Sequence, residues 1–239
     1  MTSANHRQDK SSVLVVDDDP KIRRLVATHL GQSGFEVFLA ANGEEAIYQA
    51  SLHQPDVVVL DLAMPGIDGF ETLSRLREWY TDPVIILSAT DQESEKVRAL
   101  DIGADDYITK PFGTQELAAR IRAAIRRAER LSSTADTTDP IVQAGSFEID
   151  LSARLVYRDS EEVRLTRTEY DLLRSLAVNA GKVMTHRQLL QSVWGPEYGE
   201  ETEYLRTFVK QLRRKLEEDP SRPKQILTDP AVGYRLVTN

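Results

Sequence analysis

The sequence contains no cysteine, and only four histidines are spread along its 239 residues. Without cysteine there is no disulfide framework and no thiol chemistry, which suits a reducing cytoplasm. The few scattered histidines argue against a histidine-based metal site. No apolar run approaches the roughly 18 residues of a membrane-spanning helix, and the polar N-terminus lacks the apolar core of a signal peptide. We therefore expect a cytoplasmic protein with no membrane partner, and a disordered tail over residues 1–11.

A surplus of basic charge is also missing, because the formal net charge is −8. This argues against a protein coated in basic surface, but a local basic patch can still bind nucleic acid. The length suggests two domains, each large enough to bury its own core. Residues 131–139 have almost no apolar content and precede Pro140, which is typical of a flexible linker. We expect one domain over residues 12–130 and another over residues 140–239.

Short apolar segments alternate with amphipathic ones through the first domain. The apolar segments are rich in β-branched residues, as in buried parallel strands, and the others repeat their apolar residues with helical spacing. This alternation predicts an α/β fold with a five-stranded, doubly wound parallel sheet. The expected strands are 13–16, 35–40, 55–61, 83–88 and 106–109, and the expected helices are 20–30, 43–53, 70–79, 93–102 and 114–129.

Polar side chains follow several of these strands, at the points where the strands end. They are Asp17 and Asp18, Asp61, Ser88 and Lys110. The carboxyl ends of parallel strands share one edge of the sheet, so these residues are expected to converge. Crowded carboxylates raise one another's pKa values unless a cation joins them, and oxygen-only ligands suit Mg²⁺. The alternative is that the acids only cap strand ends, with Lys110 as a surface counter-ion.

The residues expected at this edge include no general base. A carboxylate that attacks phosphorus forms an acyl phosphate, and such transfer depends mainly on positioning and on neutralisation of charge. Mg²⁺ and Lys110 would offset the phosphoryl charge, while Ser88 would donate a hydrogen bond to a phosphoryl oxygen.

The second domain is expected to begin with short antiparallel strands over residues 147–165. Two capping boxes, Thr166–Glu169 and Thr185–Gln188, then open helices. A third helix is expected from about 202 to 217, and a hairpin from 225 to 237. The arrangement predicts a smaller α+β domain of the winged helix-turn-helix type.

The third helix combines an apolar stripe (Leu205, Val209, Leu212 and Leu216) with a basic face. That face carries Arg206, Lys210, Arg213 and Arg214, with Thr207 and Gln211 between them. In a major groove, Arg reads guanine and Gln reads adenine, while other residues hold phosphates. The alternative is a basic amphipathic helix that only keeps the domain soluble, but the clustering and the hairpin that follows favour DNA binding.

Several blocks of the first domain resemble a response-regulator receiver domain, which has a flavodoxin-like fold. They are Val-Asp-Asp-Asp at 16–19, Leu-Asp-Leu-Ala-Met-Pro-Gly-Ile-Asp-Gly at 60–69, Leu-Ser-Ala at 87–89 and Gly-Ala-Asp-Asp-Tyr-Ile-Thr-Lys-Pro-Phe at 103–112. The resemblance implies that a sensor histidine kinase phosphorylates Asp61. It also implies Mg²⁺ on Asp17, Asp18, Asp61 and the backbone carbonyl of Ala63, and a commonly cis bond before Pro111.

The same resemblance implies that Ser88 and Tyr107 form a switch pair, in which Ser88 turns toward the phosphoryl group and Tyr107 packs inward behind it. From the residues alone, Tyr107 fits an ordinary half-buried strand aromatic equally well.

With its second domain included, the chain resembles the OmpR/PhoB-type regulators over nearly all of residues 12–237. The matching pieces Leu-Arg-Glu-Trp at 76–79, Ala-Gly-Lys-Val-Met-Thr-His-Arg-Gln-Leu-Leu at 180–190, Val-Trp-Gly-Pro at 193–196 and Tyr-Leu-Arg at 204–206 are most similar to the Kdp-type regulators of potassium uptake. This resemblance implies control of such an operon, with RNA polymerase and promoter DNA of tandem half-sites as partners. The DNA-binding residues implied are Arg206, Thr207, Lys210, Gln211, Arg213, Arg214, Thr228, Tyr234 and Arg235.

The resemblance also implies a homodimer on activation, formed through the helix 93–102, the strand 106–109 and the helix that follows. Matched spacing pairs Lys96 with Glu116, Asp106 with Arg120, and Asp101 with Arg127 across the subunits. Exposed pairs contribute only about 0–1 kcal/mol each, so we expect them to set register. In the hairpin, the turn Asp229–Gly233 contains Pro230 where a charged, glycine-rich turn is more usual, which leaves its contact with DNA open.

Two other functions remain open. The first is a Mg²⁺-dependent phosphatase with Asp61 as nucleophile; such enzymes commonly place an acidic residue two positions later, where this chain has Ala63. The second is a phosphorylation-independent DNA binder with a vestigial first domain, against which the intact set of polar residues at the strand ends argues.

Overall fold

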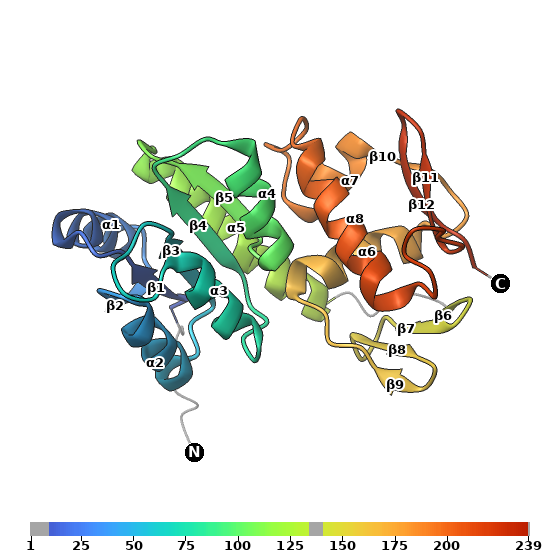
Figure 1. Cartoon of the computed structure of the whole chain (residues 1–239), viewed down its shortest axis with the longest axis horizontal. Coiled ribbons are helices and arrows are strands. Elements are labelled where there is room, and N and C mark those ends of the chain that lie inside the picture. Colours follow the sequence, from blue (N-terminus) through green and yellow to red (C-terminus); the bar gives the residue numbers. More distant parts are fainter. Residues whose placement is uncertain (1–9, 134–140, 239) are drawn as a thin grey trace, which may run out of the picture.

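The computed structural model describes residues 10–133 and 141–238, which form two domains side by side (Figure 1). In the first domain, a parallel sheet has the strand order β2-β1-β3-β4-β5. Its strands are β1 (Ser12–Val16), β2 (Glu36–Ala40), β3 (Val57–Asp61), β4 (Val84–Ser88) and β5 (Asp106–Thr109). Its helices are α1 (Pro20–Gln32), α2 (Gly43–His53), α3 (Gly69–Arg77), α4 (Glu93–Ile102) and α5 (Thr114–Ser133).

Helices cover both faces of this sheet. Val13 and Val15 of β1 pack with residues of α1 and α5 in one apolar cluster. Leu14 and Val16 of the same strand belong to the other cluster, with residues of α2, α3 and α4. Because successive side chains of a strand point to opposite faces, a strand covered on both sides is apolar throughout. The predicted doubly wound α/β fold is confirmed.

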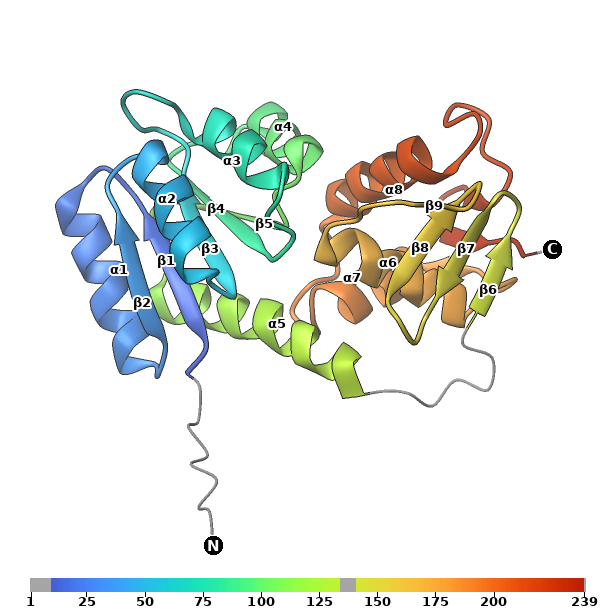
Figure 2. The ribbon, with the colours of Figure 1, turned by 90° about the horizontal axis from the view of Figure 1, so that it is seen from below.

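The second domain begins with an antiparallel sheet of β6 (Ile141–Ala144), β7 (Phe147–Asp150), β8 (Leu155–Arg158) and β9 (Glu161–Glu162). Three helices follow, α6 (Arg167–Val178), α7 (His186–Val193) and α8 (Thr202–Leu216), and Figure 2 shows them beside the sheet. A second small sheet joins β10 (Met184–Thr185), β12 (Gly233–Leu236) and β11 (Ile226–Asp229). The predicted winged helix-turn-helix is confirmed, with the β11–β12 hairpin as its wing.

The capping boxes and the apolar stripe in the sequence predict the helices of this domain correctly. Thr166 and Thr185 each form the predicted capping box, with Glu169 and Gln188 as the reciprocal partners. All four residues of the apolar stripe on α8 are buried. The strands depart more from the expectation, because β6 and β10 were not predicted and β9 lies at Glu161–Glu162, earlier than the apolar Val163 and Leu165 suggested. These short strands depend on pairing with distant partners, which periodicity does not report.

Helix α5 also extends further than expected, through Ser133 and so into the segment predicted as linker. Alanine, arginine and glutamate, which are strong helix formers, prolong it. The remaining linker residues, 134–139, and residues 1–9 of the expected tail lie outside the described residues. Within the described part of the chain, no helix has the length and apolarity needed to cross a membrane.

Candidate functional site

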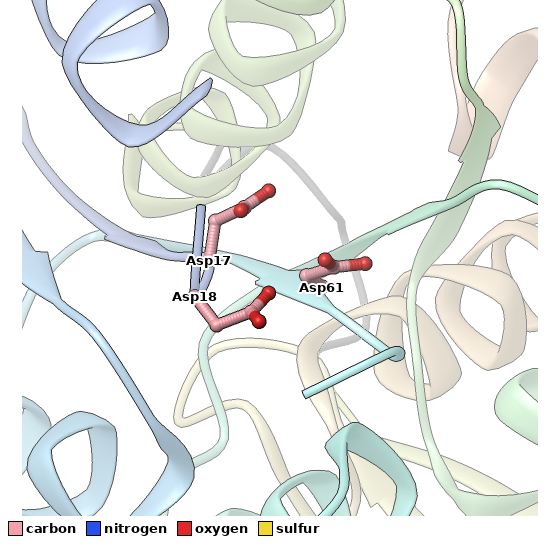
Figure 3. A group of neighbouring side chains, drawn as sticks. All are labelled: Asp17, Asp18 and Asp61. Carbon is pink, nitrogen blue, oxygen red and sulfur yellow. The ribbon is translucent and has the colours of Figure 1, made fainter. Parts of the chain in front are cut away.

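An acidic cluster lies at the carboxyl edge of the parallel sheet. Asp17 and Asp18 follow β1, and Asp61 ends β3; one carboxylate oxygen from each lies within 4.8 Å of the others (Figure 3). Asp17 and Asp61 are buried, whereas Asp18 is exposed. The parallel register that pairs Val16 with Leu60 brings the two strand ends together. The predicted convergence of these three acids is therefore present in the fold.

The loop that follows β3 turns back so close to the end of that strand that it needs a glycine at position 69. A Cβ placed on Gly69 would lie 2.3 Å from the carbonyl oxygen of Asp61 and 2.5 Å from the Cα of Leu62. On the other side of the cluster, the Asp17 carboxylate accepts the Asp19 N–H at 2.9 Å, and Asp19 in turn caps α1. Backbone contacts therefore position both buried carboxylates.

Lys110 joins the two buried acids. Its Nζ lies 2.8 Å from Asp17 Oδ2 and 2.9 Å from Asp61 Oδ2. The cis bond between Lys110 and Pro111 is present, as the resemblance implied, and the Lys110 N–H donates to the Ser88 carbonyl at 2.6 Å. Lys110 is thus a partly buried ion-pair partner of the acids and not a surface counter-ion.

Burial and the lysine act in opposite directions on Asp61. Burial raises the pKa of the Asp61 carboxyl, while the hydrogen bond and charge of Lys110 lower it, leaving the pKa above its ordinary value. Burial would lower the pKa of Lys110, but its contacts with Asp17 and Asp61 raise it on balance. The cluster therefore favours the charged form of the Lys110 ammonium and disfavours ionisation of the Asp61 carboxyl.

The donor set fits a hard divalent cation. Three carboxylates face one ammonium, so an excess of negative charge remains, and every side-chain ligand atom in the cluster is oxygen. Mg²⁺ prefers oxygen ligands and neutralises such an excess. The exposed residue Ala63 lies beside the cluster, where its N–H donates to Asp61 Oδ1 at 3.4 Å.

The two expected switch residues are both buried. Ser88 ends β4, and Tyr107 is the second residue of the neighbouring strand β5. The Tyr107 hydroxyl donates to the Thr90 carbonyl at 2.9 Å, and the Thr90 N–H donates to Ser88 Oγ at 3.3 Å. Burial raises the pKa of the Tyr107 hydroxyl. With only 5% of its surface exposed, Tyr107 is more buried than a half-covered strand aromatic, and it is linked to Ser88 through Thr90.

Helix α8 places its expected DNA-binding residues in two different environments. Arg206 is exposed and pairs with Glu203 at 2.8 Å; Arg214 is exposed as well. In contrast, Thr207 is 5% exposed and Gln211 is 6% exposed. The sequence placed both on an outward face, and this was wrong for the arrangement observed. Helix α8 packs against α4 of the first domain, where Gln211 has its hydrogen-bond partner.

The contacts with α4 are specific. The Gln211 amide donates to the Leu100 carbonyl at 2.5 Å, and Lys210 Nζ lies 2.8 Å from Asp101 Oδ2.

On the wing side of α8, Arg213 donates to the Ile226 carbonyl and to Thr228 Oγ1, both within the second domain. Tyr234 is buried edge-on to His186, and Arg235 lies 3.4 Å from Asp229. Arg213 therefore fastens the wing to α8, and Tyr234 packs the wing against the start of α7.

The residues expected at a dimer interface have partners within the chain. Arg120 lies 3.2 Å from Asp106 and 3.0 Å from Glu116, and Lys96 lies 4.8 Å from the centroid of the Tyr204 ring. Asp105 and Asp106, at the start of β5, are both buried. The side chain of Arg127 lies outside the described residues, and the cross-subunit pairs stay a prediction.

Sequence reasoning missed the residues that cover this face. Trp194, Tyr198 and Tyr204 come from the end of α7, the loop that follows and the start of α8, and all are buried. Their hydrogen-bond partners are Asp105, Asp106 and Tyr107 of the first domain. Three aromatics within eleven residues were a visible signal, but nothing in the pattern indicated which surface they cover.

Comparisons with known proteins agree with this geometry. One family model, the response regulator receiver domain, matches residues 13–122, and another, the C-terminal domain of transcriptional regulatory proteins, matches residues 160–236. The transcriptional regulatory protein KdpE of Mycobacterium tuberculosis is 49% identical over 223 residues, covering 93% of this chain and 97% of the relative.

The KDP operon transcriptional regulatory protein KdpE of Escherichia coli is 46% identical over 227 residues, which are 95% of this chain and 99% of the relative. Among solved structures, a cysteine-to-serine mutant of RitR is 27% identical with a TM-score of 0.79, and the match covers 96% of this chain and all of that one. The likeness therefore spans both domains.

Proposed function

The chain belongs to the two-component response regulators of the OmpR/PhoB type, and from that membership we propose that a phosphoryl group on Asp61 controls its binding to promoter DNA. Family membership means that a sensor kinase acts upstream and a winged-helix domain binds DNA downstream. The observation that carries the proposal is the arrangement of Lys110 between two buried carboxylates at the edge of the sheet.

In the proposed reaction, an Asp61 carboxylate oxygen attacks the phosphorus of a phosphohistidine on the sensor kinase, and the imidazole leaves. The product is an acyl phosphate. Lys110 lies within ion-pair distance of the same carboxylate, so it is placed to neutralise charge on the transferred group. The Ser88 hydroxyl, on the next strand of the sheet, donates to a phosphoryl oxygen, and Tyr107 packs inward behind it.

We propose that Asp17, Asp18, Asp61 and the backbone carbonyl of Ala63 hold Mg²⁺. When bound, the ion would neutralise negative charge on the phosphoryl oxygens. Lys110 and Ser88 would act from the other strands of the edge, so that cationic and hydrogen-bonding groups surround the transferred phosphoryl group.

Phosphorylation would shift the receiver domain toward an active form that pairs through α4, β5 and α5. Two linked output domains would then reach tandem half-sites with a higher effective concentration, and RNA polymerase would act at the promoter. The relative from Escherichia coli is named for the KDP operon. We infer control of a potassium-uptake operon here too.

A phosphatase with Asp61 as nucleophile is less well supported. The position two residues after Asp61 is alanine, so the general acid expected of such enzymes is absent there. A phosphorylation-independent DNA binder would have no need for the cluster around Lys110, whose buried acids raise the energy of the fold.

The test measures affinity for promoter DNA in two states of the full chain. Duplexes are first enriched from a random-sequence library with protein treated with beryllofluoride, which mimics the acyl phosphate, in the presence of Mg²⁺. We expect beryllofluoride to raise the affinity for the enriched duplex about tenfold or more, as two tethered domains engage together. The Asp61→Asn variant is the matched control and should not respond. Equal affinity with and without beryllofluoride would reject the switch.

A further inference from the structure

The DNA-binding helix α8 lies against α4 of the receiver domain (Figure 1). The buried Gln211 bonds to the Leu100 carbonyl of α4, and Lys210 is paired with Asp101. Thr207, one helical turn before Gln211, is buried as well. A helix that enters the major groove needs these side chains free. In this arrangement, the receiver domain occupies part of the surface that DNA would occupy.

A cluster around Asp106 holds the other end of the contact. The buried Asp106 carboxylate accepts hydrogen bonds from the Tyr204 hydroxyl at 2.8 Å and from the Tyr198 hydroxyl at 2.5 Å. Arg120 contacts the same carboxylate and also donates to the Tyr198 hydroxyl. Burial raises the pKa of the Tyr204 hydroxyl well above its ordinary value. Hydrogen bonds to a buried charge are among the stronger ones in proteins.

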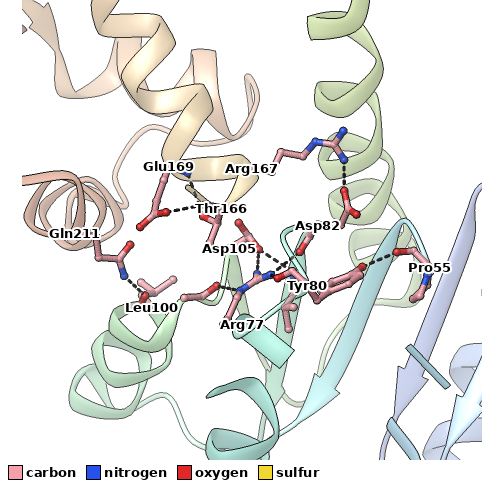
Figure 4. A network of polar contacts seen from close by, with 12 residues as sticks. Pro55, Arg77, Tyr80, Asp82, Leu100, Asp105, Thr166, Arg167, Glu169 and Gln211 are labelled. Atoms are coloured by element: carbon pink, nitrogen blue, oxygen red, sulfur yellow. Dashed lines mark hydrogen bonds and ion pairs between the residues drawn. The ribbon is translucent and has the colours of Figure 1, made fainter. Parts of the chain in front are cut away.

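A second patch fastens the α3–β4 loop to the start of α6 (Figure 4). Arg167 Nη1 lies 2.7 Å from Asp82 Oδ1, and the Arg167 N–H donates to the Thr81 carbonyl at 3.2 Å. Nearby, Arg77 connects Asp105 to the backbone carbonyl of Asp82. The two domains are therefore in contact at two separate patches, one around Asp106 and one around Asp82. Two patches together define how the domains are oriented relative to each other.

We propose that Tyr198 and Tyr204 lock the unphosphorylated chain in a closed state, in which the α4–β5–α5 face and the DNA-binding helix cover one another. This inference rests on the proposed function, because it assumes that α8 binds DNA and that α4, β5 and α5 form the dimer. Asp106 would then take part in two mutually exclusive contacts. It binds the tyrosines in the closed chain, and it is free for a partner subunit only after they leave.

The lock is connected to the phosphorylation site through Tyr107. The Tyr107 hydroxyl bonds to Thr90, next to Ser88 in space. The backbone N–H of the same residue lies 3.0 Å from the Tyr204 hydroxyl. A rearrangement of Ser88 and Tyr107 therefore acts directly on a bond of the lock. Phosphorylation would open the closed state by weakening this contact.

The first experiment removes the two hydroxyls and keeps the rings. In the full-length Tyr198→Phe/Tyr204→Phe variant without beryllofluoride, we expect a larger radius of gyration by X-ray scattering and faster amide exchange in α8. Affinity for the enriched duplex should rise about tenfold, since buried hydrogen bonds to a carboxylate are lost. The control is Tyr170→Phe, whose buried hydroxyl has no hydrogen-bond partner in the described chain, and it should behave as the unmodified protein.

The second experiment closes the lock covalently at the other patch. Because the backbones of Thr81 and Arg167 are hydrogen-bonded, cysteines there should fall within disulfide reach, and the chain has no other thiol. In Thr81→Cys/Arg167→Cys, oxidation should lower the affinity of beryllofluoride-treated protein for the enriched duplex about tenfold or more, and reduction should restore it. Neither position belongs to the proposed DNA or dimer surface.

The outcomes separate the lock from the proposed function. If the phenylalanine variant keeps the compact radius and slow α8 exchange, or the oxidised protein binds DNA as tightly as the reduced one, the lock is rejected. If the disulfide does not form in the unphosphorylated protein, the closed state is rejected. If the variant opens but its DNA affinity does not change, the lock stands and the assignment of α8 as the DNA-binding helix fails.

Discussion

The Asp61 carboxyl occupies a place that does not favour its charge. Its pKa is higher than the ordinary value of 3.8 because burial outweighs the attraction of Lys110. For a carboxyl whose folded-state pKa is raised, stability is lost as the pH rises from the unfolded-state pKa through the folded-state pKa. We therefore expect Asp61→Asn to unfold at a higher temperature than the unmodified protein at pH 7 without Mg²⁺. The difference should shrink as the pH falls toward 4, measured by calorimetry.

Mg²⁺ should reverse this order of unfolding temperatures, so that the unmodified protein unfolds at a higher temperature than Asp61→Asn. At about ten times its dissociation constant, a ligand that binds only the folded state stabilises by about 1.4 kcal/mol. The unmodified protein should gain this on addition of Mg²⁺ and lose it on chelation, while Asp61→Asn should gain much less. An equal response of both proteins would contradict a metal site that includes Asp61.

Gly69 is required by the close return of the loop after β3. A methyl group would meet the Asp61 carbonyl at 2.3 Å, where only backbone movement can relieve the clash. Gly69→Ala should lower the unfolding free energy by about 1–3 kcal/mol or more and reduce phosphorylation of Asp61 by acetyl phosphate. The matched control is Gly31→Ala, because nothing lies within 4 Å of a Cβ there. Comparable losses in both variants would show that crowding at Asp61 is not the cause.

At the scale of single elements, α7 depends on its cap. This helix spans only His186–Val193, and Thr185 Oγ1 accepts the Gln188 N–H at 3.2 Å. Thr185→Ala should destabilise the second domain by about 1 kcal/mol, whereas Thr185→Ser keeps the acceptor. Amide exchange in α7 measures the difference. If the alanine and serine variants exchange at the same rate, the capping box does not stabilise this helix.

Elements with strong local signals were predicted closely. The bounds of α2, α4 and β5 agree with the expectation, because glycine, proline and periodic apolar residues mark their ends. Short strands such as β10 could not be predicted. Met184 and Thr185 form a strand only because Tyr234 and Gly233 lie opposite, and those partners are about fifty residues away in the sequence.

At the scale of the whole molecule, the proposed activation would exchange one set of contacts for another. Arg120 and Asp106 pair within the chain, and the proposed dimer needs Asp106 to face a partner subunit. Sedimentation should show a shift from monomer to dimer when beryllofluoride and Mg²⁺ are added at micromolar protein, and return to monomer on chelation. Asp61→Asn should stay monomeric throughout. A dimer of the same strength without beryllofluoride would contradict dimerisation on activation.

The sequence by itself determined the folds of both domains and the edge at which Asp17, Asp18, Asp61, Ser88 and Lys110 meet. It could do so because the alternation of strand and helix periodicity indicates the fold class, and a parallel sheet brings its strand ends together whatever the spacing along the chain.

Only the tertiary structure decided how the two domains face each other. The burial of Asp106 and Gln211 depends on contacts across about a hundred residues of sequence, such as those between Tyr204 and Asp106 and between Gln211 and Leu100. The sequence pattern around a polar residue on a helix face is the same whether water, DNA or another domain covers that residue. The physical reason is that surface complementarity arises from shape and charge assembled in three dimensions, and no local pattern records it.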